Sequence, residues 1–496
     1  MSQQIISEIN QLRNKGKKIG LVHGVFDVIH IGHIKYFQEA KEKVDILIAS
    51  VTDDLHVNKA PGKPIFNLSQ RIEVLKNLSC LDYVIKSQKP TSVEIINLIK
   101  PHIYFKGRDY KENIDVTKNI VKEERAIKKF NGKIIYTKSK IFSSSKIINT
   151  KFNYLNQEFL EFVKKIKTTN IKNKFYNNFK NKINKKILII GDPIIDIYKY
   201  VQPSGKSNKA TIISTIYKKK ITFGGGTFLV ANFLSNFCNN INLIQFSNKY
   251  NNHLYKKFLK KNINLIKLST TKKIVKKIRY VDNYSNNKLY QVTENEESNI
   301  EKTSNLKYLN ILKRLINKND YIFVFDYGYS SLNKEITEYI NKIKTKKKII
   351  NCQTNSYNYG YNNFLKFKNA NIMCIDELEF RLGVQNKNEN IVNLISNNTL
   401  KKFDNFIVTL GKNGCIIKNK MSNTYIPTIF NSAKDTLGCG DIFVSTFGLL
   451  KMTNKFSTHE MGIISHLSAA IHADSVGKKQ SINFEKLYKV IENVIK

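Results

Sequence analysis

Three histidines stand within eleven residues in the stretch HGVFDVIHIGH, residues 23–33. Such a cluster could ligate a metal, pack in a core or bind phosphate. Zinc would need a third and a fourth ligand, and neither an HExxH motif nor a cysteine pair lies nearby. His30 and His33 stand where an apolar segment ends and a helical one begins, and helix N-termini at strand ends attract phosphate. We therefore expect both to bind phosphate, and His23 to be a hydrogen-bonded core residue.

A second stretch whose residues could take part in catalysis is NSAKDTLGCGDIFVSTFGLL, residues 431–450. Gly438 and Gly440 leave backbone N–H groups free to point into one space, which the following apolar helix faces with its N-terminus. Asp441 could there remove a proton from a hydroxyl while the amides hold a transferred phosphoryl group. The alternative is an Asp N-cap on a glycine-rich turn.

The elements that must position these residues alternate between short apolar strands and helices from Lys18 onward. This alternation predicts a parallel sheet covered by helices, and it stops near Thr150. Residues 156–166 predict one amphipathic helix, and the Lys/Asn-rich residues that follow predict a solvated connector. The strand KILIIGD, residues 186–192, opens a second α/β region. We thus predict an α/β protein with domains at 1–150 and 187–496, joined by a connector at 151–186.

Composition narrows the classes of function. No apolar run approaches the ~20 residues of a membrane span, and residues 1–18 lack the apolar centre of a signal peptide, so a cytoplasmic protein is expected. Six scattered cysteines without a CxxC pair favour reduced thiols. The net charge of +43 invites a nucleic-acid partner, but Lys, Asn and Ile are enriched together and the lysines form no aromatic-studded patch. A basic nucleic-acid-binding or scaffold protein with silent sites remains the alternative class.

The first motif has a family likeness. GVFDVIHIGHIKYFQEAK resembles the G-x-F-D-x-x-H-x-G-H signature of cytidylyltransferase-like nucleotidyltransferases, and the likeness continues through NKAPGKPIFNLSQRIEVL, IKPHIYFKGRDY and FSSSKIIN over residues 18–150. It implies a Rossmann-like domain in which a sugar phosphate attacks the α-phosphate of ATP or CTP and releases pyrophosphate. His30 and His33 would stabilise the pentavalent phosphorus. The other nucleotide-binding residues that it implies are Val25, Phe26, Lys59, Arg71, Gly107, Asp109, Ser143, Ser144 and Ser145.

Two of these assignments have a plain structural alternative. Lys59 and Arg71, expected to address phosphates, could be solvated surface charges in so basic a chain. The three serines, expected to hold the triphosphate tail, could cap the helix that begins near Lys146.

DTLGCGDIF resembles the D-T-x-G-A-G-D signature of ribokinase-like carbohydrate kinases, with further matching motifs over residues 187–496. The likeness implies a ribokinase-like α/β kinase in which Asp441 is the general base and Glu379 helps to organise Mg²⁺ through water. Implied sugar-binding residues are Asp196, Gly225 and Gly226. Implied residues of the ATP site and anion hole are Thr409, Gly411, Gly414, Gly438, Cys439 and Gly440. Leu229 replaces the usual Asn of the sugar site, and Asp376 stands where Asn begins the N-x-x-E motif.

A kinase joined to a nucleotidyltransferase resembles the bifunctional enzymes of nucleotide-activated heptose synthesis. The likeness implies ATP-dependent phosphorylation of a sugar or sugar phosphate, nucleotidyl transfer from ATP or CTP to a sugar 1-phosphate, Mg²⁺ for both reactions, and a homodimer. Here the transferase comes first, and the sugar is left open. The alternative within enzymes is a degenerate kinase half, suggested by Leu229.

Overall fold

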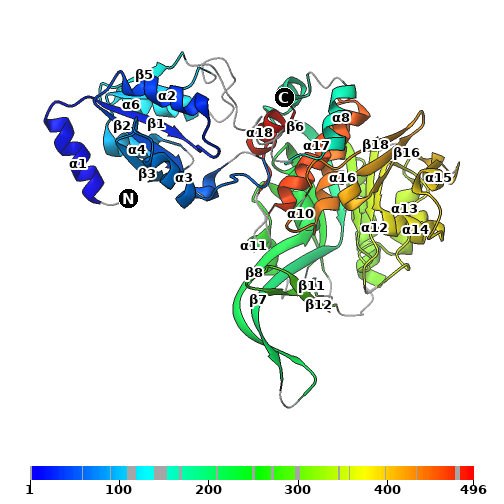
Figure 1. Ribbon diagram of the computed structural model, residues 1–496. Coiled ribbons are helices and arrows are strands. Elements are labelled where there is room, and N and C mark those ends of the chain that lie inside the picture. The colour runs from blue at the N-terminus through cyan, green and yellow to red at the C-terminus, as the bar shows by residue number, and fades with distance from the viewer. Residues whose placement is uncertain are drawn as a thin grey trace. The chain divides into compact units, whose positions relative to one another are not determined.

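The computed structural model divides into two compact units, with the main boundary between Tyr154 and Leu155 (Figure 1). The residues that the structure describes are 3–57, 60–89, 91–108, 119–138, 154–166, 170–207, 210–247, 252–269, 273–295, 302–344, 347–356, 358–396, 398–431, 433–474 and 481–495.

The first unit is built on a five-stranded parallel sheet in the order β3-β2-β1-β4-β5. Its strands are β1 (Ile19–Gly24), β2 (Ile46–Thr52), β3 (Tyr83–Ser87), β4 (Ile103–Lys106) and β5 (Lys133–Tyr136). From β1, the strands β2 and β3 are added on one side of the sheet and the strands β4 and β5 on the other. The switch point of the topology therefore lies between β1 and β4. In open parallel sheets the ligand crevice lies at this point, beyond the carboxyl ends of the strands.

Helices pack on both faces of this sheet. They are α1 (Gln3–Asn14), α2 (Ile31–Lys41), α3 (Leu68–Lys76), α4 (Val93–Ile99) and α6 (Asn119–Lys128). Alternate residues of β1 serve the two faces: Val22 belongs to the core with Phe37 of α2, whereas Leu21 belongs to the core with Ile96 of α4. A strand buried on both sides explains the continuous apolar run that predicted it.

The second unit contains a nine-stranded sheet in the order β10-β9-β6-β13-β14-β15-β16-β17-β18. It is parallel except for β17 and β18, which are antiparallel. Its strands are β6 (Ile183–Gly191), β9 (Cys238–Ser247), β10 (Ile263–Ser269), β13 (Tyr321–Asp326), β14 (Lys347–Cys352), β15 (Ala370–Asp376), β16 (Phe403–Thr409), β17 (Cys415–Asn419) and β18 (Asn423–Ile426). The parallel strands end at one edge, so the residues that follow them meet there.

Helices surround the large sheet. They are α8 (Gln157–Ile166), α9 (Ile171–Phe179), α10 (Thr227–Leu234), α11 (Asn252–Phe258), α12 (Lys302–Ile316), α13 (Lys334–Lys342), α14 (Glu377–Val384), α15 (Ile391–Ser396), α16 (Cys439–Lys451), α17 (Thr458–Ala473) and α18 (Phe484–Val494). Residues 441–450 of α16 are all buried, which makes this helix central to the unit and explains its apolar sequence.

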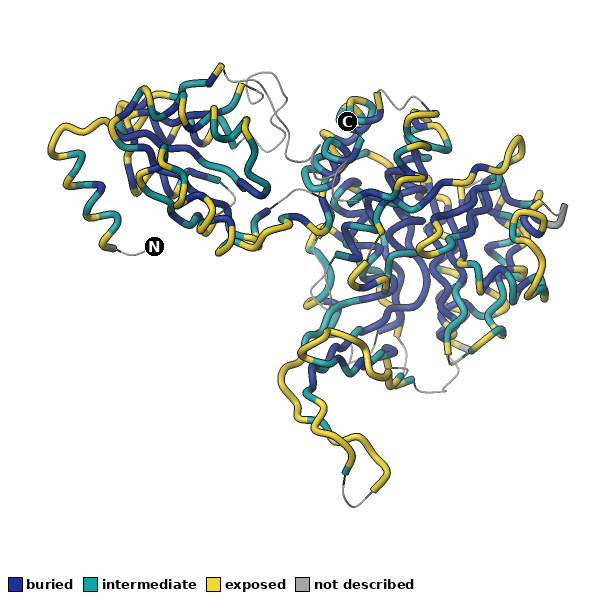
Figure 2. The backbone as a smooth tube through the Cα atoms, viewed as in Figure 1, coloured by how far each residue is buried: buried dark blue, intermediate teal, exposed yellow. Residues whose placement is uncertain are grey.

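A smaller four-stranded sheet, in the order β12-β11-β7-β8, completes the second unit. Its strands are β7 (Pro193–Lys206), β8 (Ile213–Gly226), β11 (Val275–Asp282) and β12 (Lys288–Glu294). The β7–β8 hairpin is buried near its base and exposed towards its tip (Figure 2). Both ends of the hairpin at its base therefore reach the interior of the unit.

The structure does not show a solvated connector where the sequence predicts one, after residue 166. Residues 171–179 form α9, which buries Ile171, Phe175 and Phe179 in the second unit, and α8 buries Phe159. The aromatic residues recur at i and i+4 and thus share one helix face. Because Lys and Asn dominate the composition of this segment, its narrow apolar helix face was not predicted from the sequence.

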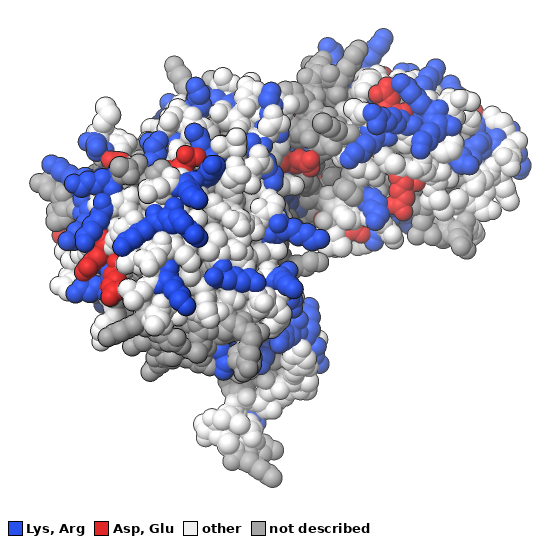
Figure 3. All heavy atoms as spheres, turned by 180° about the vertical axis from the view of Figure 1, so that it is seen from behind, with Lys and Arg blue, Asp and Glu red and all other residues white. Residues whose placement is uncertain are grey.

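Two surface properties bear on the expected class of protein. None of the helices in the described part of the chain combines the length and hydropathy that a bilayer-spanning segment needs. On the face shown in Figure 3, Lys and Arg side chains are scattered over the surface and do not gather in one block.

Candidate active sites

In the first unit, several of the expected residues lie at the carboxyl ends of β1 and β4. Val25 and Phe26 directly follow β1, Gly107 directly follows β4, and these two strands are paired neighbours. His30 and His33 stand at the start of α2, the helix that returns from β1. Since ligands bind beyond the carboxyl ends of strands at such a point, the sheet topology gathers these residues around one candidate site.

His30 is the N-cap of α2, and its ring is oriented by the helix. Its Nδ1 accepts a hydrogen bond from the Gly32 backbone N–H at 3.1 Å. In the neutral ring, an accepting Nδ1 leaves the proton on Nε2, so Nε2 is a donor. The ring of His33 stacks on it with 4.0 Å between centroids. The two histidines therefore form one unit at a helix N-terminus, where an anion is favoured.

The Phe26 side chain packs against the His33 ring. Its backbone has a φ of 49°, and its buried ring meets His33 edge-on at 5.7 Å and Phe37 at 5.2 Å. A left-handed backbone is strained for Phe, so the surrounding packing must hold it. The structure thus gives Phe26 a packing role beside His33, while the expected contact with nucleotide stays a prediction.

His23 is hydrogen-bonded, as the sequence predicts, but it is half-buried at the end of β1 and not a fully buried core residue. Its Nδ1 lies 2.8 Å from the Ser50 hydroxyl, and burial lowers its pKa to about 4. It is therefore neutral at physiological pH.

Arg71 lies inside the first unit, not on its surface. Its side chain has no exposed area, and its guanidinium donates to the backbone oxygens of Phe66, Val25 and Thr52 and to the Asp54 carboxylate. The reading as a solvated surface charge is wrong, because all these partners surround it. The direct contact with phosphate stays a prediction, and in this arrangement Arg71 fixes the chain that follows β1.

Replacing Arg71 tests which role dominates. Arg71→Met would remove the hydrogen bonds to three backbone oxygens and the ion pair with the exposed Asp54, so we expect the first unit to lose ~2 kcal/mol of unfolding free energy. Urea unfolding followed by circular dichroism measures this loss. Arg125→Met, at an exposed position of α6, is the matched control. An unchanged stability with a raised KM for nucleoside triphosphate would assign Arg71 to phosphate instead.

The remaining residues expected in the transferase site, Lys59, Asp109, Ser143, Ser144 and Ser145, lie outside the described residues.

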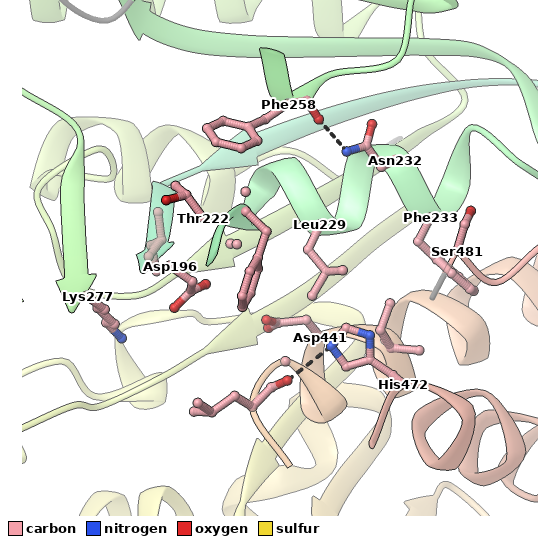
Figure 4. Close-up of a pocket in the computed structure, with 18 of the residues that line it drawn as sticks. Asp196, Thr222, Leu229, Asn232, Phe233, Phe258, Lys277, Asp441, His472 and Ser481 are labelled. Atoms are coloured by element: carbon pink, nitrogen blue, oxygen red, sulfur yellow. Dashed lines mark hydrogen bonds between the residues drawn. The ribbon is translucent and has the colours of Figure 1, made fainter. Parts of the chain in front are cut away.

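In the second unit, a cavity of about 440 Å³ opens between the small sheet, α10 and the N-terminus of α16 (Figure 4). Among the expected residues that line it are Asp196, Gly225, Gly226, Leu229, Gly438 and Asp441. Asp196 from β7, Leu229 from α10 and Asp441 from α16 all point into it (Figure 4). The structure therefore brings the expected base and the expected sugar-binding residues into one cavity.

Asp441 lies in the first turn of α16 and is 5% exposed. Burial raises the pKa of its carboxyl to about 7, against hydrogen bonds and the nearby Lys277 ammonium, which lower it. Gly438, the N-cap, has a φ of 77°, and a Cβ there would lie 2.7 Å from Leu229 Cδ2 and 2.9 Å from His472 Nε2. Gly440 faces open space. A base with a pKa near neutrality beside a bare helix N-terminus suits proton removal during phosphoryl transfer.

The Asp196 carboxylate is held by Arg279 of β11, which forms an ion pair with it. Gly225, on the paired strand β8, leaves the room that the carboxylate occupies, because a Cβ at this position would lie 2.0 Å from Asp196 Oδ2. Its lack of a side chain is thus required by a neighbour within the site, not by its backbone conformation.

Gly225→Ala should displace the Asp196 carboxylate while leaving α16 intact. If Asp196 grips sugar hydroxyls, we expect a loss on the order of 10²-fold in kcat/KM for the sugar, because a displacement near 1 Å in a positioned group has that effect. The KM for ATP should stay unchanged. Steady-state assays of ADP release check both values, and an unaltered sugar dependence would contradict the assignment of Asp196.

The residues expected around ATP and Mg²⁺ lie along the same sheet edge but do not line this cavity. Thr409 ends β16, Gly411 and Gly414 flank the turn that follows, and Thr409 is the register partner of Asp376. Glu379 forms a capping box with Asp376 and also accepts the Thr354 N–H at 3.1 Å. Burial and Asp376 raise the Glu379 pKa to about 8. Their contacts with nucleotide and metal stay predictions.

Cys439 has a structural environment. Its Sγ lies 3.5 Å from the Ala469 carbonyl oxygen. The Cys439 side chain thus packs against α17.

Sequence reasoning assigned no role to several polar residues of the cavity, among them Lys277, Arg279, Tyr327 and Gln353. Lys277 and Arg279 alternate on β11, so they face the same side of the small sheet, and this spacing was a usable signal. The Gln353 amide donates to Asp441 Oδ1 at 2.9 Å. The Tyr327 hydroxyl is buried beside Asp441, and burial raises its pKa. No motif marked Gln353, because it follows a strand distant from Asp441 in sequence.

The comparisons with known proteins follow the division into two units. Residues 21–151 match the model of the cytidylyltransferase-like family, and residues 184–482 match that of the pfkB family of carbohydrate kinases. The second match covers more than half of the chain. The chain belongs to the pfkB family.

Curated relatives of this pfkB-family chain carry the name bifunctional protein HldE. The proteins from Aliarcobacter butzleri and from Nitratiruptor sp. are both 40% identical, over 125 and 124 residues, which is 25% of this chain and 26% and 27% of theirs. The chain thus matches about a quarter of the length of these relatives. The crystal structure of phosphofructokinase-2 from Escherichia coli in complex with substrates and products is similar in fold over 63% of this chain and all of that one, with a TM-score of 0.51 and 12% identity.

Proposed function

We propose that this pfkB-family chain is a bifunctional enzyme that makes a nucleotide-activated sugar. The second unit transfers the γ-phosphoryl group of ATP to a hydroxyl of a sugar or sugar phosphate. The first unit transfers a nucleotidyl group from ATP or CTP to a sugar 1-phosphate and releases pyrophosphate. The relatives named bifunctional protein HldE, and the likeness to the enzymes of activated heptose synthesis, make heptose the first sugar to test.

The observation that carries the kinase assignment is the placement of Asp441. Its buried carboxylate shares a cavity with Asp196 and stands in the first turn of a helix whose glycine N-cap leaves the amides bare. A hydroxyl held by Asp196 can lose its proton to Asp441 while the amides hold the phosphoryl oxygens.

The cavity also favours a phosphorylated sugar over a neutral one. Four cationic side chains line it, namely Lys257, Lys260, Lys277 and Arg279. Arg279 is paired with Asp196, which leaves three lysines against one carboxylate, that of Asp441. A phosphate on the sugar would balance this charge.

For Mg²⁺, the carboxylates at the carboxyl end of β15 fit an indirect role. Both Glu379 oxygens already accept backbone N–H groups, from Asp376 at 2.8 Å and from Thr354 at 3.1 Å. Mg²⁺ keeps several of its waters in nucleotide sites, so a carboxylate oriented in this way can bind those waters. The ion would supply charge neutralisation at the phosphates, and Glu379 and Asp376 would orient its water shell.

For the transferase, His30 and His33 would donate to the α-phosphate region as negative charge develops there, and no covalent intermediate is needed. We also propose a cytoplasmic location, because the cysteines are free thiols, which reducing compartments maintain. The homodimer expected from the family likeness stays a prediction.

A panel of sugars and sugar 1-phosphates, incubated separately with ATP and with CTP, tests this proposal. We expect ADP from at least one sugar or sugar phosphate, and pyrophosphate from at least one sugar 1-phosphate. Pyrophosphate without any ADP would favour the degenerate kinase, for which Leu229 in the cavity is the specific observation. Neither product, together with tight, salt-sensitive binding of DNA or RNA, would favour the nucleic-acid-binding alternative.

A further inference from the structure

Two side-chain amides connect the backbone of β15 to the Asp441 carboxylate. Asn351 Nδ2 donates to the Cys374 carbonyl oxygen at 2.9 Å. Gln353 Nε2 donates to Asn351 Oδ1 at 2.8 Å and to Asp441 Oδ1 at 2.9 Å. The chain of hydrogen bonds thus runs from β15 through β14 and its following residue to α16.

The direction of this relay is fixed at its far end. A backbone carbonyl can only accept, so the Asn351 amide must present its nitrogen to Cys374 and its oxygen to Gln353. Gln353 must then present its nitrogen to Asn351, and the same nitrogen reaches Asp441. Reversing either amide would bring two acceptor oxygens together, so the hydrogen bonds fix the orientation of both amides.

Gln353 is itself held in place by its backbone. Its N–H donates to the Asp326 carbonyl oxygen at 2.8 Å, and its carbonyl oxygen accepts from Asn362 Nδ2 at 2.9 Å. Asn351 is buried in β14. The donor that faces Asp441 is therefore preorganised by three strands of the sheet.

We propose that Asn351 and Gln353 are positioning residues of the kinase, which keep Asp441 Oδ1 a hydrogen-bond acceptor and thereby make Oδ2 the atom that receives the substrate proton. An Oδ1 that carried the proton would face the Gln353 amide donor, with no acceptor to meet it. The inference rests on the proposed kinase activity and goes beyond it by assigning separate roles to the two carboxylate oxygens.

The step balances with ATP as the other reactant. The O–H bond of the sugar hydroxyl breaks and its proton passes to Asp441 Oδ2. The hydroxyl oxygen forms a bond to the γ-phosphorus, and the bond from that phosphorus to the β,γ-bridging oxygen breaks, with the electron pair leaving on ADP.

Other groups that face Asp441 come from each element packed around the cavity. Burial and Asp196 oppose ionisation of the Asp441 carboxyl, whereas hydrogen bonding from Tyr327, the Lys277 ammonium and hydrogen bonding from Gln353 favour it. Tyr327, Cys374 and Glu379 are further titratable groups that sense the Asp441 charge, and His472 of α17 lines the same cavity. Gln353→Leu is a neutral substitution of similar size that removes the amide donor and leaves the Tyr327 hydroxyl and Lys277 in place.

The pH profile of kcat separates positioning from a merely structural role. Gln353→Leu removes the donor, so the acidic limb should move up by about one pH unit, and Gln353→Glu should move it further because a second carboxylate faces the first. At pH 7 this gives about a 5-fold lower rate for Gln353→Leu, regained at high pH. Asn351→Leu, which frees the Gln353 amide to rotate, should move the limb in the same direction. Gln157→Glu, exposed on α8, is the matched control and should move nothing.

A direct titration keeps the inference testable even if no sugar is found. With ¹³Cγ-labelled aspartate, the Asp441 resonance is identified by its absence in Asp441→Asn, and its midpoint is followed in wild type and in the two Gln353 variants. Higher midpoints in both variants support the relay. Unchanged or lower midpoints, or rates reduced equally at every pH, would overturn it. A wild type without ADP release but with the predicted midpoints would refute the proposed function alone.

Discussion

Asp441→Asn should reduce kinase turnover by ~10³-fold while pyrophosphate release continues at the wild-type rate. The reason is that asparagine keeps the size and the hydrogen bond from Gln353 but cannot take the proton of the sugar hydroxyl. The measurement is ADP release at saturating sugar and ATP, run beside pyrophosphate release from a sugar 1-phosphate. Asp404→Asn, at a half-exposed position of β16, is the matched control.

The same variant carries a stability prediction that shows whether it folds. The pKa of Asp441 in the folded protein, about 7, lies above its unfolded value, so the folded state favours the protonated form. Wild type therefore loses stability as pH rises from about 4 to about 7, and the asparagine variant, which cannot ionise, does not. We expect Asp441→Asn to unfold at a higher urea concentration than wild type at pH 8. A variant that is less stable at pH 8 would show that its lost turnover reflects misfolding.

His33→Ala should reduce nucleotidyl transfer by ~10²–10³-fold and leave the kinase unaffected. The His33 ring stacks on His30 at a helix N-terminus, and removing a preorganised donor at the point where charge develops has an effect of this size. Pyrophosphate release from the best sugar 1-phosphate measures it.

His253→Ala, exposed on α11, is the control for a histidine lost elsewhere. A His33→Ala protein that releases pyrophosphate at the wild-type rate would remove the histidine pair from the mechanism. The same holds for His30→Ala, whose ring is fixed by the Gly32 N–H and presents Nε2 as the donor.

Much of the fold could be predicted because its signals are local. Strands buried on both faces read as continuous apolar runs, and the strand-to-helix junctions at His30 and at Asp441 carry glycines and polar residues at fixed spacing. The hydrogen bonding of His23 was predicted from its place on an apolar strand, and the structure shows this bond, to Ser50, at a half-buried position. The pfkB family and the α/β class of both units follow the sequence-based predictions.

The parts of the site that were not predicted from the sequence depend on contacts between segments that are distant in the chain. Gln353 reaches Asp441 across 88 positions of sequence, and Arg279 reaches Asp196 across 83. Arg71 has the residue type of a phosphate ligand, and only its own burial and its four hydrogen-bond partners reveal a structural role. Likewise, the helix at residues 171–179 hides three apolar residues among lysines and asparagines.

The central claim is that one chain holds two independent sites, each centred on phosphorus. Separate quantification of ADP and of pyrophosphate, for Asp441→Asn and His33→Ala side by side, tests it most directly. We predict that the first variant loses only ADP and the second only pyrophosphate. A single variant that loses both products while remaining folded would contradict the account.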